Sequence, residues 1–139
     1  MAVFALMDAK VSLQVGSSSA VSISSYVTGG TLEHSNDPLE TTAMGSTTKT
    51  RTYGVQDWTA KIELNQDFTV IDALLWSAHN ASAVTLTIIP VDTSVSATNP
   101  QYAGNVLLPS YSPISQNHGE LAKVSLDFVA NGALARTTS

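Results

Sequence analysis

His34, Asp37 and Glu40 follow one another at intervals of three residues in a polar segment of the chain. Imidazole and carboxylate groups at such positions are ligands that a metal such as zinc accepts. The spacing is nonspecific, however, and no further histidine lies nearby in the sequence. A solvated turn, bent by the Asp37-Pro38 pair, is the simpler interpretation. We therefore predict no metal site.

Nucleophilic catalysis has no recognisable local signature in this chain. A Ser-His-Asp triad assembles in space, so the linear sequence alone does not decide the question. There is nevertheless no nucleophile elbow and no glycine-rich phosphate loop. His79 is best explained by the dipole at the C-terminal end of a predicted helix. We predict that the protein is not an enzyme and needs no cofactor.

The composition is that of a globular protein with an unusually uncharged surface. Apolar residues make up 43 % of the 139 residues, but charged residues make up only 12 %, roughly half the usual share. Serine and threonine replace the missing charges, and a hydroxyl-rich surface is desolvated at modest cost. The composition therefore favours large protein–protein contacts within a single domain spanning residues 1–139.

The net charge of −5 argues against tight DNA binding, which needs several cations to neutralise phosphates. The six bases are scattered along the sequence: Lys10, Lys49, Arg51, Lys61, Lys123 and Arg136. Lys49 and Arg51 form the one close pair, which is either solvated or placed to meet an acidic neighbour. No apolar stretch approaches the ~20 residues of a membrane helix, and the N-terminus lacks the basic start of a signal peptide. We expect a soluble protein made in a cytoplasm, with no membrane segment.

Alternation of apolar and polar residues predicts about seven strands, most clearly over residues 58–64 and 121–129. Helical spacing predicts one helix over residues 68–79, with Asp67 as its N-cap and Trp76 packed in the core together with Trp58. We expect a mainly β fold, either a two-sheet β-sandwich or a partly closed barrel, flanked by this α-helix. Its edge strands carry few charges and are suited to pairing with another subunit.

Three segments carry no clear period. Residues 33–50 are polar and contain Asn-Asp-Pro, and we predict a long loop there, which Leu39 and Met44 anchor on a neighbouring copy. Residues 1–9 are predicted as an irregular arm or a short first strand. Residues 133–139 are predicted as a short tail.

The order of these elements, together with several short stretches, resembles the tail tube (major tail) proteins of long-tailed bacteriophages and related phage-like particles. After an N-terminal hairpin, the matching stretches are NDPLETTAMG at 36–45, GVQDW at 54–58, NPQYAG at 99–104, GE at 119–120 and NGALAR at 131–136. Each stretch is short, and the resemblance depends on their order along nearly the whole chain.

The resemblance implies hexameric rings that stack into a tube, whose lumen conducts DNA without binding it specifically. It implies contacts with other tail proteins (tape measure, terminator and distal tail) and a place in the tail of a virion assembled in the host bacterial cytoplasm. The candidates for contact between subunits or rings are Asp37, Leu39, Glu40, Met44, Lys49 and Arg51. By strand alternation alone, Glu63 and Asp127 are candidates for the lumen.

Three other functions fit parts of the sequence. A capsid decoration protein, or a head–tail joining or tail-completion protein, shares the low charge and β content but does not polymerise into tubes. A ligand-binding β-sandwich predicts a stable monomer with aromatic residues around a concave site, and aromatics are only 6 % here. A small hydrolase requires a cluster of titratable residues that is sensitive to mutation.

Overall fold

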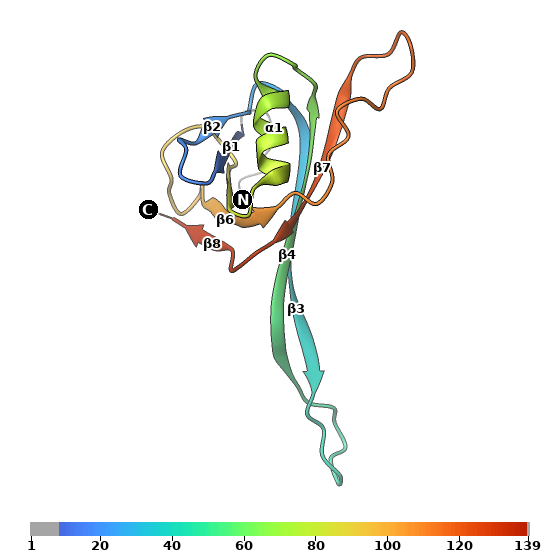
Figure 1. Cartoon of the computed structure of the whole chain (residues 1–139). Coiled ribbons are helices and arrows are strands. Elements are labelled where there is room, and N and C mark those ends of the chain that lie inside the picture. Colours follow the sequence, from blue (N-terminus) through green and yellow to red (C-terminus); the bar gives the residue numbers. More distant parts are fainter. Residues whose placement is uncertain (1–8, 139) are drawn as a thin grey trace.

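The computed structural model describes residues 9–138, so the segment predicted as an N-terminal arm lies almost entirely outside the described residues. The described part is mainly β, with a single helix, which confirms the predicted fold class (Figure 1). The elements are β1 (Lys10–Val15), β2 (Val21–Ser22), β3 (Val27–Glu40), β4 (Arg51–Asn65), α1 (Ile71–Asn80), β5 (Val84–Ile89), β6 (Gln101–Leu107), β7 (Lys123–Ala130) and β8 (Ala135–Thr137).

The strands form one antiparallel sheet rather than the two sheets of a sandwich. Its order is β2-β1-β5-β6-β7-β4-β3, and β8 pairs with β6 beside this path. The sheet curls around the core but does not close, because β2 and β3 stay as edges at its two ends. An open edge presents unpaired backbone groups, which is the property expected of a subunit that pairs with other copies.

The predicted alternation explains how the sheet encloses its core. In β4 the side chains of Trp58, Ala60, Ile62 and Leu64 are buried, and the residues between them are exposed. In β7 the buried set is Val124, Leu126 and Phe128. Helix α1 adds Ile71, Leu75 and Ala78 to the same cluster. Each of these elements therefore has one face in the core and one in solvent.

The helix differs from its prediction at its N-terminal end. It begins at Ile71, its N-cap position is Val70, and no side chain caps it. Asp67 instead stabilises the preceding turn, because its carboxylate accepts hydrogen bonds from the Thr69 amide (3.0 Å) and hydroxyl (2.6 Å). These bonds, first of all the one from the Thr69 hydroxyl, lower the pKa of Asp67. The prediction of Trp76 as a core residue is also wrong, since its side chain is 58 % exposed.

The predicted loop over residues 33–50 is correct for residues 41–50 and wrong for residues 33–40, and the predicted C-terminal tail is wrong at residues 135–137. Residues 33–40 continue β3, which pairs with an equally extended β4 from Val27↔Leu64 to Glu40↔Arg51, and only residues 41–50 connect the two strands. Pro38 fits there because β3 is an edge strand, where a missing N–H is tolerated. The predicted tail contains β8, which pairs with β6 after a turn at Gly132 (φ +135°).

Candidate assembly surfaces

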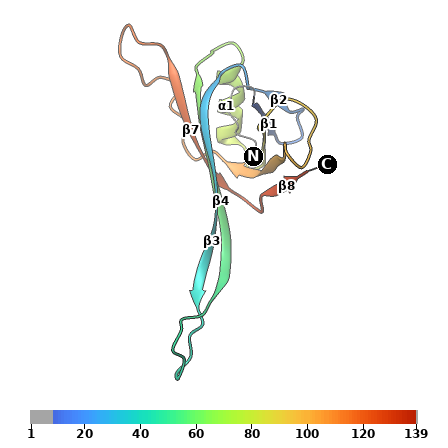
Figure 2. The ribbon, with the colours of Figure 1, turned by 180° about the vertical axis from the view of Figure 1, so that it is seen from behind.

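The outer parts of β3 and β4 form a long hairpin, residues 33–57, which we call the arm. Figures 1 and 2 show it extending away from the rest of the fold. Within the arm the two strands pair only with each other, since β7 pairs with β4 from Thr59 onward. Almost every arm side chain is exposed, and none belongs to the core. The arm therefore contributes exposed surface and little to the packing of the fold.

All six predicted contact residues lie on the arm. Asp37, Leu39 and Glu40 are on β3, Met44 and Lys49 are in the connection 41–50, and Arg51 begins β4 directly opposite Glu40. Met44 is fully exposed. Among the described residues, neither Lys49 nor Arg51 forms an ion pair. These residues are thus gathered at one end of the molecule with their charges and apolar atoms in solvent.

Two further arm residues with exposed apolar side chains were not predicted as contact residues. Tyr53 and Val55 on β4 are large and largely exposed, and Leu39 on β3 is half exposed. Leu39 packs over Gly54, where an added Cβ would lie 3.0 Å from the Leu39 Cδ1 atom. The alternation of Tyr53 and Val55 with their neighbours in RTYGVQD (51–57) is a sign of a strand. Because neither face of this strand is buried in the monomer, the alternation does not mark a core.

The arm meets the core at Trp58, which is 3 % exposed. The indole lies over Gly104 on β6, and its Nε1 atom donates a hydrogen bond to the Gly132 carbonyl oxygen (2.9 Å). Trp58 thereby joins three parts of the fold at the position where β7 ends and the chain turns toward β8. The indole is therefore buried and hydrogen bonded at the position where the arm begins.

The solvent face of β3, β4 and β7, which we call the open face, holds the two predicted lumen candidates. Glu63 lies opposite Gly29 on β3 and Ser125 on β7, and Asp127 lies opposite Lys61. The Lys61 Nζ and Asp127 Oδ1 atoms are 3.8 Å apart, both well exposed, so this pair contributes little to stability. Glu33 and Lys123 share the face by register. Asp57, opposite Ser35, lies on the same face, which therefore carries four acids and two bases.

The opposite end of the molecule from the arm is formed by the β6–β7 loop, residues 109–122 (Figures 1 and 2). Its base is fastened by Gln66, whose Nε2 atom donates to the Tyr111 hydroxyl and to the Pro113 carbonyl oxygen (both 3.0 Å). The Tyr111 hydroxyl donates to Asp72 (2.8 Å), and burial is the main reason that the pKa of Tyr111 is raised. Ile114 and Leu121 are held outward, 80 % and 67 % exposed.

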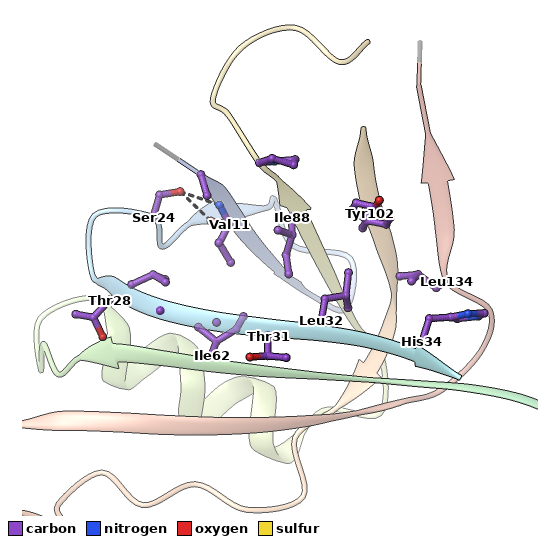
Figure 3. A pocket seen from close by; sticks show the side chains of 15 residues that line it. Val11, Ser24, Thr28, Thr31, Leu32, His34, Ile62, Ile88, Tyr102 and Leu134 are labelled. Carbon is purple, nitrogen blue, oxygen red and sulfur yellow. Dashed lines mark hydrogen bonds between the residues drawn. The ribbon is translucent and has the colours of Figure 1, made fainter. Parts of the chain in front are cut away.

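A hollow of about 440 Å³ lies where the sheet fails to close, between β3 and the strands β1, β5 and β6. Figure 3 shows Leu32, Ile88 and Tyr102 around it. The Ser24 hydroxyl at its rim is already hydrogen bonded to the Val11 amide (2.8 Å). The lining is mostly apolar, and its polar side chains are the hydroxyls of Ser24, Thr28, Thr31 and Tyr102 and the imidazole of His34. This hollow is the open seam of the sheet.

The remaining candidates for chemistry are dispersed. Within residues 9–138, no group of three or more histidine, cysteine, aspartate or glutamate side chains lies close enough together to hold a metal. His34, Asp37 and Glu40, whose spacing was weighed as a metal site and not predicted as one, are spread along the β3 strand of the arm. In the same part of the chain, no helix is both long and apolar enough to cross a membrane.

These observations define a class of protein: a single-sheet β domain with an open edge and a protruding hairpin arm. Comparison with family models and with curated proteins gives no match. Comparison with solved structures does. The SPP1 tail tube matches with a TM-score of 0.75 at 10 % identity, over 95 % of this chain and 77 % of that chain.

Two further structures match at similar levels. The tail of an empty gene transfer agent particle, determined with C6 symmetry, has a TM-score of 0.73 at 15 % identity, over 94 % of this chain and 95 % of that chain. The 6-fold symmetrised baseplate of the anti-feeding prophage has a TM-score of 0.67 at 7 % identity, over 99 % and 98 %. The chain therefore has the fold of phage tail tube structures, which confirms the resemblance seen in its sequence.

Proposed function

We propose that this chain is the structural subunit of a phage-type tail tube. Its copies form hexameric rings, the rings stack into a tube in the tail of a virion, and DNA passes through the lumen without specific binding. Assembly takes place in the host bacterial cytoplasm, and the tube contacts tape measure, terminator and distal tail proteins. The protein has no catalytic role in this proposal.

The arm is the observation that carries the proposal. A hairpin whose side chains bury no core, and whose large apolar residues stay in solvent, has no function in an isolated monomer. Exposed apolar groups of this kind mark an interaction surface. The fold is shared with structures determined under sixfold symmetry, and the open edge β3 offers a further site for pairing between copies.

Purified protein at high concentration is expected to form rings and hollow tubes, because the contacts of a head-to-tail assembly repeat without limit. Negative-stain electron microscopy and sedimentation velocity measure this directly. A monomer that persists at every concentration contradicts the proposal. Trimers that never polymerise instead support a capsid decoration protein.

We further propose that the open face lines the lumen, with Glu63 and Asp127 repelling the phosphates of the passing DNA. Tubes assembled from the Glu63→Lys variant are expected to retain short duplex DNA at about 50 mM salt and to release it near 200 mM. The reason is that each added lysine contributes a phosphate contact that weakens as the salt concentration rises. Cosedimentation of labelled DNA with the tubes measures retention.

Asp92→Lys provides the matched control for this prediction. Asp92 lies outside the open face, in the connection between β5 and β6, and is paired at the surface with Lys10 (3.9 Å). The same change of charge there is expected to leave the tubes without DNA. Equal retention by both variants would show that the open face does not line the lumen.

A further inference from the structure

We infer that the surface that receives the arm is the β6–β7 loop of a second copy of this chain. The tip of the arm, residues 41–50, contacts residues 109–122 of the next copy along the tube axis. This inference rests on the proposed function, and it adds the identity of both contact surfaces.

The two surfaces lie at opposite ends of one molecule. The tip joins β4 at Arg51, and the β6–β7 loop joins β7 at Lys123, which is paired with Asn65 at the other end of β4. The 15 residues of β4 separate these positions by about 45 Å at the usual rise per residue. A molecule therefore cannot make this contact with itself. Two different surfaces at opposite ends join copies head to tail, which is the arrangement that forms an open filament.

Each surface exposes large apolar side chains. Met44 at the tip is fully exposed, and Leu39 is half exposed on the adjoining part of the arm. The loop presents Ile114 and Leu121. Contact between the two ends removes these groups from water, and burial of apolar surface is the main favourable contribution to most protein association.

The charges of the two surfaces are complementary. The tip carries one charged residue, Lys49, and the residues that flank the tip, Glu40 and Arg51, are opposite in charge and paired with each other. Glu120 is the sole acidic residue of the loop, which contains no lysine or arginine. In a chain with so few charges, a base-only tip and an acid-only loop favour pairing between unlike ends and disfavour contact of two tips or two loops.

The loop is also fixed in position before any contact is made. In addition to the bonds at its base, the Gln116 Nε2 atom donates to the Lys123 carbonyl oxygen (2.9 Å), and the Glu120 amide donates to the Asn117 carbonyl oxygen (3.2 Å). A preorganised surface loses little conformational entropy on binding. This distinguishes the loop from an unstructured connection of the same length.

Disulfide trapping tests the inference, because the chain contains no cysteine. The double variant Met44→Cys, Ile114→Cys, assembled into tubes and then oxidised, is expected to give a ladder of covalent oligomers on non-reducing gels that extends well beyond hexamers. A mixture of the two single variants is expected to stop at dimers. The control pair Met44→Cys, Ser77→Cys, with its second cysteine exposed on α1, is expected to remain monomeric on the gel.

Charge reversal is a second, independent test. Lys49→Glu and Glu120→Lys are each expected to lower the pelletable fraction about tenfold, because the lost contact is repeated at every subunit of every ring. The combined variant is expected to recover tubes.

The outcomes separate this inference from the proposed function. If the unaltered protein forms no tubes, the proposed function fails. If tubes form but the control pair gives the ladder, or the cysteines at position 44 of two copies join to each other, the arm contacts a different surface and only this inference is overturned.

Discussion

Replacement of residues 37–55 by Asn-Gly is expected to abolish tubes while leaving a folded, monomeric domain. Asn36 and Gln56 are directly paired, so a two-residue turn between them closes the shortened hairpin in the geometry that such turns favour. The deleted residues include all six predicted contact residues, and none of them belongs to the core. We therefore expect the free energy of unfolding to change by no more than about 1 kcal/mol.

Electron microscopy and sedimentation measure the loss of assembly, and thermal unfolding followed by circular dichroism measures stability. A second variant separates the tip from the rest of the arm. Replacement of residues 40–51 by Asn-Gly, closed by the Leu39–Thr52 pair, removes Met44 and Lys49 but retains Tyr53 and Val55. Loss of the fold in either variant would mean that the arm stabilises the domain, and normal tubes from the longer deletion would contradict the proposed function.

Gly104→Ala is expected to destabilise the domain more than any other single methyl addition at a described glycine. The new Cβ would lie 2.5 Å from Cζ2 of Trp58 and 3.2 Å from the Ala133 carbonyl oxygen. The indole is buried and hydrogen bonded to Gly132, so it cannot move aside without losing both packing and that bond. Overpacking of this kind costs about 2–3 kcal/mol.

Chemical denaturation monitored by fluorescence measures this loss. Gly29→Ala is the matched control, because its Cβ would lie 4.0 Å from Glu63 Oε2, its nearest atom, on the open face. A glycine-to-alanine change without a clash reduces the entropy of the unfolded chain, so we expect the control to be neutral or slightly stabilising. Equal stability of the two variants would show that the Trp58 indole is not held against Gly104 in the way described.

The sequence predicted the elements that have one face in the core. The alternation around Ile62 and Leu126 identified β4 and β7 correctly, because burial on one side forces a period of two. The helix was placed within three residues at its start. The acid at position 67 was assigned as its cap, but its carboxylate is occupied by Thr69.

The strands of the arm were not predicted, because they lack the buried face that made β4 and β7 recognisable in the core. Neither face of residues 33–40 is buried in the monomer, so apolar and polar residues do not alternate there as they do in a strand with one face in the core. Pro38 is in addition a residue that normally interrupts a strand. The arrangement of the strands in a single sheet could not be predicted either, because alternation shows which residues face inward but not which strands are neighbours. Trp76 was assigned to an apolar face of the helix, but the buried stripe of α1 passes through Leu75 and Ala78 and leaves the indole exposed.

One feature of β4 has a mechanical consequence. The strand runs from the arm into the core, paired with β3 on both sides of a β-bulge between Asn36 and Pro38, and with β7 from Thr59 onward. A pull on the arm along its axis acts parallel to the strands, and therefore across hydrogen bonds that lie perpendicular to them. The force is shared by the bonds between β4 and β7 in shear instead of opening them one after another, so in the proposed tube the hairpin is suited to carry tension.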